Sequence, residues 1–450
     1  MVKTKGARSV PSILEWLRLV YAGESAGGNN LAQPALAAQW LEDDPGLLGT
    51  DPYLACAAGD LDILKHTLAT DPSWVNRPGG PVKLPPLVAV THSSLCRLPP
   101  WQEPMLECAR LLLAHGADPN AAIGSLTALY GAVGQNSNLE MTRLLLAAGA
   151  DPDDGECLYH SLPNCAITRL LLEAGVPIGP SNALYHAFDY ADPTPLLLLL
   201  QFGADANQPA LAAPTSWFGT PLLWALRRRV SIAHIEALLS AGADTCTHTP
   251  GGISAFQLAR RYGLPQVAEL LVRWGASEDA GSGQEQLLGA CGCEQEATAR
   301  ALLRATPDLI QKLAASDLAL LPELVAAGAH AAARLMVTLG WPLDAKGGDW
   351  SATALNVAVF QGDVALARFL LEHGASWTET HGYDSNVCGT LSWACRNRPA
   401  PEGDWPGCAQ LLLEYGMPAG QRDPGRPGQL LIDGHYLPFT EEVIQVLVAH

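Results

Sequence analysis

The chain has 450 residues, of which 48% are hydrophobic and 16% are charged, and its formal net charge at pH 7 is -18. Its length exceeds what one ordinary hydrophobic core organises, and its apolar content excludes a mainly disordered chain. The acidic balance excludes a general affinity for nucleic-acid backbones, and the longest leucine tract, residues 196–200, is far shorter than the roughly 18 residues of a membrane-spanning helix. We therefore expect neither a nucleic-acid nor a membrane partner.

The N-terminal segment begins with basic residues, but Glu15 and Arg18 interrupt the apolar region that a signal peptide needs. We expect residues 1–48 to form an N-terminal helical cap. Eleven cysteines at irregular spacings favour reduced thiols in a cytoplasmic protein over a disulfide framework. Cys291 and Cys293 have no second pair at zinc spacing, so we expect no metal site. The composition, with more arginine than lysine, favours a bacterial source.

A leucine-rich segment that ends in glycine recurs about ten times, as in LLLAHGADPN at 111–120 and LLLAAGADPD at 144–153. The spacing of the final glycines is near 33 residues; they stand at positions 116, 149, 175, 203, 242, 275, 340, 374 and 416, with Thr306 in the place of one of them. A period of this length is typical of stacked helical repeats.

Each unit reads as a turn, a short helix, a longer helix and a loop. In residues 124–154, Thr127 is placed to cap the short helix, and residues 139–148 form the longer one. Gly149 supplies the left-handed residue that ends it. One helix pair cannot bury its apolar face alone, so neighbouring pairs must stack. Small residues in the first helices permit this: Ala132, Ala187, Ala225, Ala259, Ala358 and Ala394.

These units resemble ankyrin repeats. The segments that carry the resemblance are LTALYGAV at 126–133, GTPLLWAL at 219–226, TALNVAV at 353–359 and GADPN at 116–120. The resemblance covers residues 51–420. It implies an all-α fold, an ankyrin-type helical repeat solenoid with short hairpin loops and helical capping segments. The sequence has no GxSxG, GxxxxGK(S/T) or HExxH motif and no GxGxxG after a strand, so we expect a protein-binding scaffold that is not an enzyme and needs no cofactor.

We expect four regions after this pattern: the cap over residues 1–48, a first repeat block over 49–280, degenerate helical repeats over 281–345, and a C-terminal repeat block with a helical cap over 346–450. Four insertions interrupt the units, at 91–104, 208–220, 378–390 and 397–407. Long loops on a rigid scaffold are common binding sites.

The strongest candidate site combines arginine with aromatic residues. Residues 221–275 carry six arginines against Glu236, Asp244 and Glu269, a local charge of +3 in an acidic chain. Trp224, Arg227 and Arg228, and then Arg260, Arg261 and Tyr262, occupy corresponding positions after the small residue of a first helix, and Trp393, Arg396 and Arg398 repeat the pattern. Such a surface suits an acidic or phosphate-bearing partner segment. The alternative is that these arginines pair with carboxylates of adjacent repeats.

Tryptophans in turn-rich sequence are the second candidate. GGDW at 347–350 and EGDW at 402–405 place Trp350 and Trp405 in loops, and Trp217 and Phe218 stand in another insertion. We expect exposed aromatic anchors there, with packing against the scaffold as the alternative.

The sequence thus favours a monomeric module that binds a protein partner in its concave groove and at its loop tips. The alternative is an enzyme or small-molecule receptor with a pocket under the loops of residues 341–408, formed by Asp349, Trp350, His381, Asp384, Trp393, Arg396 and Asp404. A third possibility is a self-assembling structural solenoid.

Overall fold

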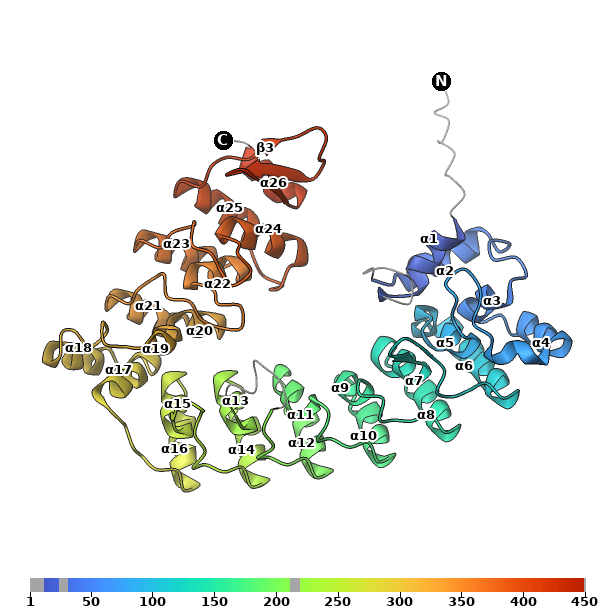
Figure 1. Cartoon of the computed structure of the whole chain (residues 1–450), viewed down its shortest axis with the longest axis horizontal. Coiled ribbons are helices and arrows are strands. Elements are labelled where there is room, and N and C mark those ends of the chain that lie inside the picture. The colour runs from blue at the N-terminus through green and yellow to red at the C-terminus, as the bar shows by residue number, and fades with distance from the viewer. Residues whose placement is uncertain (1–11, 24–30, 211–218, 449–450) are drawn as a thin grey trace. The chain divides into compact units, whose positions relative to one another are not determined.

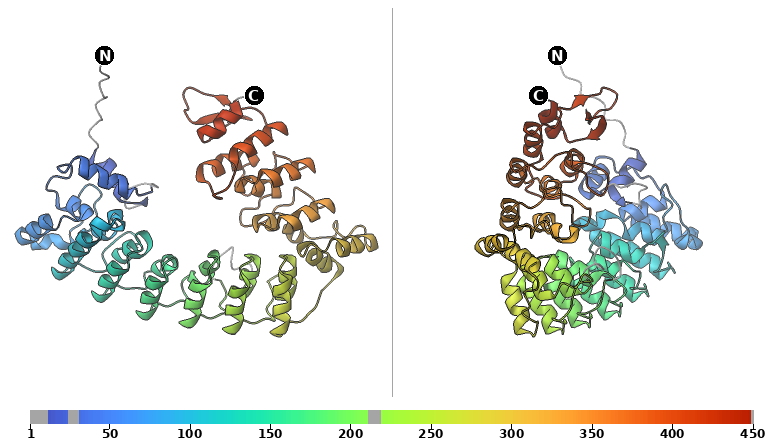
Figure 2. Two further views of the ribbon diagram at one scale, coloured as in Figure 1. Left: turned by 180° about the vertical axis from the view of Figure 1, so that it is seen from behind. Right: turned by 60° about the vertical axis from the view of Figure 1, so that its left-hand side comes forward.

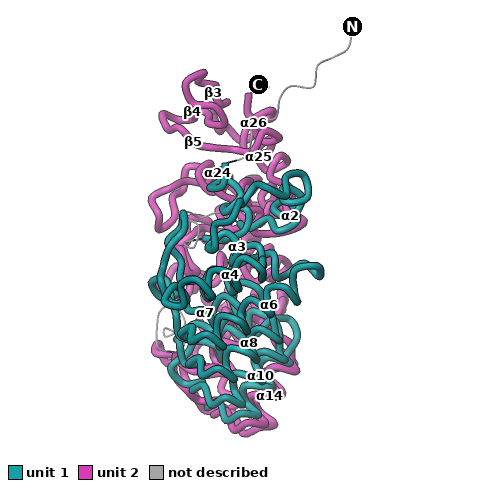
Figure 3. The backbone as a smooth tube through the Cα atoms, turned by 90° about the vertical axis from the view of Figure 1, so that its right-hand side faces the viewer, with its two compact units in different colours: residues 1–205 teal, residues 206–450 magenta. Residues whose placement is uncertain are grey.

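The computed structural model describes residues 12–23, 31–210 and 219–448, and it forms two compact units, residues 1–205 and residues 206–450 (Figure 3). The predicted anchors Trp217 and Phe218 lie outside the described residues. The division between the units differs from the boundaries predicted after residues 48, 280 and 345.

Unit 1 is a series of helix pairs with one short β-ribbon. Its elements in chain order are α1 (Ile13–Val20), α2 (Pro34–Asp43), α3 (Pro52–Ala58), α4 (Leu61–Thr70), η2 (Pro72–Asn76), α5 (Pro86–Thr91), η3 (Ser94–Arg97), α6 (Pro99–Ala114), β1 (Ala122–Ile123), β2 (Leu126–Thr127), α7 (Ala128–Tyr130), the π-helical turn η4 (Gly131–Gln135), α8 (Leu139–Ala147), α9 (Cys157–Ser161), α10 (Cys165–Glu173), α11 (Ala183–His186), η5 (Ala187–Asp189) and α12 (Thr194–Gln201). Figures 1 and 2 show α7, α9 and α11 side by side along one face of this unit, and α8, α10 and α12 along the other.

Unit 2 continues the helix pairs and adds a small sheet. Its elements are α13 (Pro221–Arg227), α14 (Ile232–Ser240), α15 (Ala255–Arg261), α16 (Pro265–Arg273), α17 (Gly283–Gly292), α18 (Glu296–Ala305), α19 (Ala315–Leu318), α20 (Leu320–Ala326), α21 (His330–Thr338), α22 (Ala354–Gln361), α23 (Val364–Glu372), α24 (Val387–Asn397), α25 (Trp405–Glu414), β3 (Gln421–Arg422), β4 (Gln429–Ile432), β5 (His435–Pro438) and α26 (Glu441–Val448). The predicted all-α repeat fold is confirmed.

The recurring glycine ends the second helix of each pair, as predicted. Gly149 has φ = 93°, and its amide donates to the carbonyl of Leu146 while the amide of Ala150 donates to that of Leu145. Two carbonyls at the helix end are thereby satisfied by one left-handed residue, which a side chain would strain. The same pair of hydrogen bonds closes α6, α10, α12, α14, α16, α21, α23 and α25. At the helix start, the hydroxyl of Thr127 accepts from the amide of Tyr130 at 2.9 Å, which confirms the predicted cap.

The small residues predicted to permit close stacking are all fully buried: Ala132, Ala187, Ala225, Ala259, Ala358 and Ala394. Polar side chains of the loops add a second connection between successive repeats. Asn76 Nδ2 donates to the carbonyl of Gly116 at 2.8 Å, and its Oδ1 accepts from the amide of Asp118 at 2.8 Å. Asn120 and Asn207 form the same bridge to the next loop. The asparagine of the GADPN segment therefore ties one repeat to its neighbour.

The insertion at 91–104 is not an exposed loop. Residues 91–96 are buried, and Pro99 already begins α6. Ser93 donates its hydroxyl proton to the carbonyl of Ala57 at 2.7 Å, and Tyr21 of the N-terminal segment donates to the carbonyl of Ala89 at 2.9 Å. Residues 91–96 are therefore buried in the scaffold, whereas Arg97, Pro99, Pro100 and residues 102–104 are exposed.

The sheet near the C-terminus was not predicted from the sequence. Strands β3, β4 and β5 pair antiparallel in that order, with Ile432 opposite His435 across a turn of Asp433 and Gly434. Both turn residues have positive φ, and an Asp-Gly pair between apolar runs is a strong hairpin signal. The segment LLIDGHYLP therefore predicts a β-hairpin, whereas the repeat pattern around it predicts helices.

Candidate functional site

The arginines of α13 and α15 meet carboxylates of their own chain. Arg227 Nη2 lies 2.9 Å from Asp349 Oδ1 and 3.9 Å from Glu323 Oε1, and only 11% of its side chain is exposed. Tyr262 is buried and donates its hydroxyl proton to Glu323. Burial disfavours the charged form of Arg227, but Tyr262, Glu323 and Asp349 together raise its pKa. Arg227 is thus a positive charge that lies next to the carboxylates of Glu323 and Asp349 and near the hydroxyl group of Tyr262.

Arg261 forms a second ion-pair cluster beside the first. Its Nε and Nη2 face the carboxylate of Glu285, with Nε at 2.8 Å from Oε1, and its Nη1 lies 2.9 Å from Asp317 Oδ1. All three guanidinium nitrogens therefore face carboxylates, and the side chain is 9% exposed. Arg261 is thus buried in ion pairs within the chain.

Two glycines explain how α15 and α17 approach so closely. A Cβ built on Gly292 would lie 2.1 Å from the carbonyl oxygen of Arg261, and one on Gly263 would lie 2.5 Å from that of Gly292. Only backbone without side chains fits this contact.

Arg229 of the preceding repeat also reaches across to donate to the carbonyl of Ala327 at 3.1 Å. Side chains from repeats that are not adjacent in sequence therefore meet inside unit 2.

These contacts correct the predicted basic patch. Trp224 is buried with the guanidinium groups of Arg227 and Arg228 over its ring, at 5.1 Å and 5.9 Å from the centroid. Arg227 and Arg261 form ion pairs with carboxylates of the chain itself, as in the alternative interpretation, and Tyr262 donates to one of these carboxylates. Arg228 is exposed, and Arg260 donates to the side chain of Gln295 at 3.3 Å. The sequence could not distinguish these cases because the carboxylates come from distant repeats.

An aromatic hollow lies between α22, α24 and the loops before them. Its volume is about 690 Å³, and we define it by its lining residues: Asp349, Trp350, Phe360, His381, Tyr383, Ser385, Gly389, Thr390, Ser392, Trp393, Arg396, Leu437 and Pro438. The rings of Phe360 and Trp393 are stacked with centroids 5.4 Å apart, and Trp350 lies 5.4 Å from Phe360. The structure thus brings together three predicted site residues, Trp350, Trp393 and Arg396.

The polar groups of the hollow occupy its edge. The Nε of Arg396 donates to the carbonyl of Ser392 at 3.1 Å, and within the described residues the guanidinium has no ion pair. Burial, followed by the charge of Lys346, lowers the pKa of His381, whose Nδ1 accepts from the amide of Tyr383. Asp349 is held by Arg227. The hollow therefore offers apolar rings and one unpaired cation.

A second, smaller hollow of about 330 Å³ adjoins the first. Arg227, Arg228 and Tyr262 line it, together with Asp349 and Trp350, which line both hollows. Trp350 therefore stands between the ion-pair cluster of Arg227 and the aromatic hollow.

Several predicted residues lie outside the hollow. Trp405 is buried, and its indole N–H donates to the carbonyl of Phe360 at 3.4 Å, so the exposed aromatic anchor predicted there is wrong and packing against the scaffold, the alternative, is found. Asp404 accepts from the amide of Gly407 at 2.7 Å as the cap of α25. Arg398 ends α24 and lies over the ring of Trp405 at 5.7 Å. Asp384 occupies an exposed turn whose amide donates to the carbonyl of His381.

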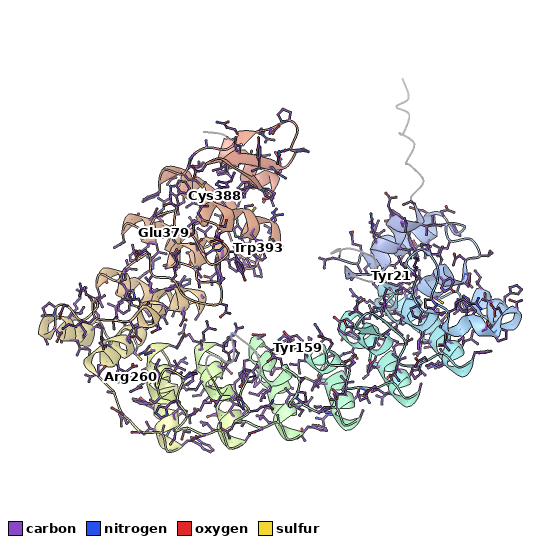
Figure 4. All side chains as sticks on the ribbon, viewed as in Figure 1. Tyr21, Tyr159, Arg260, Glu379, Cys388 and Trp393 are labelled. Atoms are coloured by element: carbon purple, nitrogen blue, oxygen red, sulfur yellow. The ribbon has the colours of Figure 1, made fainter. Side chains whose placement is uncertain are left out.

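Three residues that line the hollow were not predicted from the sequence. Phe360 follows the apolar core of α22, Tyr383 lies in the insertion at 378–390, and Pro438 ends β5. The carbonyl of Pro438 accepts from the hydroxyl of Ser392 at 2.6 Å, which fixes the hairpin against α24. The Asp-Gly hairpin signal in the sequence could have identified Pro438 as a lining residue. Figure 4 labels Trp393 and Cys388 at different places along α24.

The repeat architecture agrees with a family comparison. Residues 125–155, which contain β2, α7 and α8, match the family model of the ankyrin repeat. This chain contains an ankyrin repeat. Among solved structures, the human ASB11 ankyrin repeat domain resembles it at 23% sequence identity; the match covers 51% of this chain and 99% of that domain, with a TM-score of 0.38. No curated protein has a significant match to the chain.

In unit 2, helix starts form hydrogen bonds that reach the next helix pair. Asn356 Nδ2 donates to the carbonyl of Glu379 at 3.3 Å, and Gln257 Nε2 donates to that of Asp279 at 3.2 Å. Thr390 in turn donates to Asn356 Oδ1 at 2.7 Å. The floor of the aromatic hollow is thereby fixed to the loop that carries His381 and Tyr383.

The described part of this chain contains no cluster of three or more His, Cys, Asp or Glu arranged to hold a metal ion. None of its helices within the described residues is both long enough and apolar enough to cross a bilayer. The carboxyl groups whose pKa departs from the ordinary value in those residues, Glu15, Asp71, Asp308 and Asp423, all have it lowered. None of these four is prepared to act as a general acid.

Proposed function

We propose that this chain is a non-enzymatic module that binds a protein partner through the aromatic hollow of unit 2. The observation that carries the proposal is the exposure of Trp393, 48% of which is open to solvent beside Trp350 and the unpaired Arg396. Exposed aromatic residues next to arginine on a rigid element are frequent centres of binding energy in protein interfaces.

The partner segment that suits this surface presents an apolar or aromatic side chain beside a carboxylate or phosphate group. The apolar group fills the hollow against Trp350 and Trp393, and the acidic group pairs with Arg396. Arg228, exposed at the adjoining hollow, extends the same preference. Arg227 and Arg261 contribute indirectly, because their ion pairs hold Asp349 and the neighbouring helices in place. The acidic partner predicted from the sequence thus remains part of the proposal, and Arg228 and Arg396 are two of the six arginines predicted to meet it.

A peptide-display selection against the full chain tests this proposal. We expect enrichment of peptides that combine an aromatic or branched apolar residue with an acidic neighbour. Trp393→Ala and Arg396→Glu should each weaken their binding by about tenfold or more, which is typical of a central interface residue.

The chain contains matched controls for both substitutions. Trp274, in another repeat of the same unit, is 49% exposed, and Arg273 beside it is exposed as well. Trp274→Ala and Arg273→Glu should leave the selected peptides bound. Equal losses in the test and control variants, or enrichment without acidic residues, would refute the proposed surface.

A small-molecule receptor is the second candidate function. Its support is the volume of the hollow, about 690 Å³ with aromatic walls, which falls within the roughly 300–1,000 Å³ of ordinary ligand sites. Screening small aromatic carboxylates by tryptophan fluorescence distinguishes the two candidates. A compound that binds the wild type, loses affinity in Arg396→Glu and does not compete with selected peptides would favour the receptor.

A further inference from the structure

A groove lies among the N-terminal helices of unit 1, between the loop that follows α2, the helices α3 and α4, and the start of α6. Its volume is about 400 Å³. We call it the cap groove and define it by six of its lining residues: Leu41, Leu48, Asp60, Ile63, Trp101 and Pro104. Figure 1 labels α2, α3, α4 and α6 at the N-terminal end of the unit. The cap groove is separate from the aromatic hollow, which belongs to unit 2.

The lining of the cap groove is mostly apolar and has little rotational freedom. It includes three prolines and two alanines: Pro45, Pro100, Pro104, Ala55 and Ala58. Neither proline nor alanine loses side-chain entropy when it is ordered. Trp101 is half-buried and adds a large aromatic surface to the same lining. The groove is therefore largely formed before a partner binds, which lowers the entropic cost of association.

Backbone packing sets the floor of the cap groove. Gly59 ends α3 with φ = 77°, and its amide donates to the carbonyl of Ala55. A Cβ built on Gly59 would lie 3.3 Å from the sulfur of Met105 and 3.4 Å from the Cβ of Pro104, which both belong to α6. A glycine at this position thus permits the end of α3 to approach α6 closely.

Acidic residues stand beside the lining residues in the chain. Glu42, Asp43 and Asp44 occupy the positions between the lining residues 41 and 45, and all three are exposed. Asp60 lines the groove itself, and Asp62 is exposed one position before the lining residue 63. Within residues 12–23, 31–210 and 219–448, the carboxylates of Glu42, Asp43 and Asp62 form no ion pair and accept no hydrogen bond. The rim of the groove therefore carries carboxylates that are available to a cationic partner.

Few basic residues of the surrounding sequence balance this negative charge. Residues 41–65 and 99–110, which contain all the lining residues, hold eight acidic residues against Lys65 and Arg110, a local charge of -6. Arg110 already forms ion pairs with Glu103, at 3.1 Å, and with Glu107. The cap groove thus combines an apolar lining with a negatively charged surrounding.

We propose that the cap groove is a docking surface for a segment of another protein that presents apolar side chains between basic residues. The apolar side chains fill the groove against Ile63 and Trp101, because their removal from water is favourable. The basic residues lie beside Glu42 and Asp43, where opposite charge favours them and would repel an acidic segment. This inference is independent of the function proposed for the aromatic hollow, because it concerns another unit and a partner segment of opposite charge.

Fluorescence anisotropy with labelled peptides tests the inference on the full chain. The three probes have equal length: leucines flanked by lysines, the same leucines flanked by glutamates, and lysines with serine in place of leucine. We expect the first peptide to bind and the other two to bind about tenfold more weakly or less, because each lacks one of the two contributions. Glu42→Gln with Asp43→Asn should weaken the first peptide by about fivefold, since two rim charges are lost. Ile63→Ser should weaken it by about threefold or more, since apolar contact is lost.

Matched variants in unit 2 separate a docking surface from general attraction to an acidic chain. Glu236→Gln with Glu269→Gln removes the same formal charge from exposed positions of α14 and α16, and Ile232→Ser replaces an isoleucine that is 44% exposed. Both controls should retain the affinity of the wild type, and circular dichroism should show every variant folded. If Ile63→Ser does not fold, the two double variants make the comparison.

Four results would overturn the inference. They are absence of binding, equal losses in the two double variants, equal affinity for the lysine and glutamate peptides, and wild-type affinity in a folded Ile63→Ser variant. Light scattering that shows a dimer of the wild type and a monomer of Ile63→Ser would assign the groove to a second copy of the chain, which would also overturn it.

Discussion

Arg227 and Asp349 are 122 residues apart in the chain, yet Arg227 Nη2 lies 2.9 Å from Asp349 Oδ1. In a regular stack of repeats, each helix pair contacts only its neighbours. Here the loop before α22 reaches back to α13, and Glu323 of α20 contributes to the same cluster. The pair therefore links the ion-pair clusters of unit 2 to Trp350 and the aromatic hollow.

Removing this link should loosen the hollow. Arg227→Met leaves the partly buried Glu323 and the exposed Asp349 without their cation, so we expect a loss of about 2 kcal/mol in unfolding free energy. Faster hydrogen exchange at residues 347–350 should accompany the loss. Exchange that is unchanged there, measured by mass spectrometry against Arg273→Met, would show that the pair does not hold the loop.

The ion pair of Arg261 and Glu285 is more deeply buried than that of Arg227 and Asp349. Removing one partner should therefore lower the unfolding free energy more than replacing both partners with apolar residues. Arg261→Met strands the carboxylate of Glu285, and we expect a loss of about 3 kcal/mol. Arg261→Met with Glu285→Met should recover most of that loss, because no buried charge in this pair remains unpaired. Urea denaturation of the four proteins of this cycle provides the measurement, and additive losses would contradict the expectation.

The asparagine bridge between loops should contribute modestly to stability. Asn76→Ala removes two hydrogen bonds, to the carbonyl of Gly116 and from the amide of Asp118, at an exposed position. We expect a loss of about 1 kcal/mol in unfolding free energy. Asn182→Ala, at an exposed position of the same unit, should change it by less than about 0.5 kcal/mol. Thermal denaturation of both variants makes the comparison.

Two glycines with equal space around them should respond to alanine in opposite directions. A Cβ on Gly149 or on Gly283 meets nothing within 4 Å, but only Gly149 has positive φ. Gly149→Ala should lower the unfolding free energy by about 1 kcal/mol through backbone strain. Gly283→Ala, at the first residue of α17, should raise it by about 0.5 kcal/mol. Changes of the same sign would refute the conformational explanation.

His92 should make the stability of the protein depend on pH. Burial lowers its pKa from 6.5 to about 4, although the carbonyl of Thr127 acts in the opposite direction. The unfolded chain therefore binds a proton that the folded chain rejects between about pH 6.5 and 4. Stability from this group is complete above pH 6.5 and decreases as the pH falls, by about 3 kcal/mol in total.

Denaturation between pH 4 and 7 tests this dependence. His92→Gln keeps a donor for the carbonyl of Thr127 without a titrating ring. In this variant the unfolding free energy should depend less on pH, because the contribution of His92 is missing. His115→Gln, at an exposed position, should keep the pH dependence of the wild type. Equal slopes in the wild type and His92→Gln would assign the pH dependence to other groups.

The sequence by itself determined the repeat and its local chemistry. Gly149 and its equivalents, the cap at Thr127 and the buried alanines such as Ala132 follow from short-range sterics and hydrogen bonding, which each unit repeats. Trp350, Trp393 and Arg396 were also predicted as site residues, because aromatic residues and arginine in or beside insertions stand out from the repeat.

Only the tertiary structure decided which arginines are buried in ion pairs. Arg228 and Arg261 have the same kind of neighbours in sequence, but Arg261 meets Glu285 and Asp317 while Arg228 remains exposed. The carboxylates come from other repeats, and the close approach of Gly263 and Gly292 brings them into reach. A periodic pattern specifies contacts within a unit and with its neighbours, whereas the curvature of the stack depends on packing between backbones. The pairing of distant side chains therefore had to be observed in three dimensions.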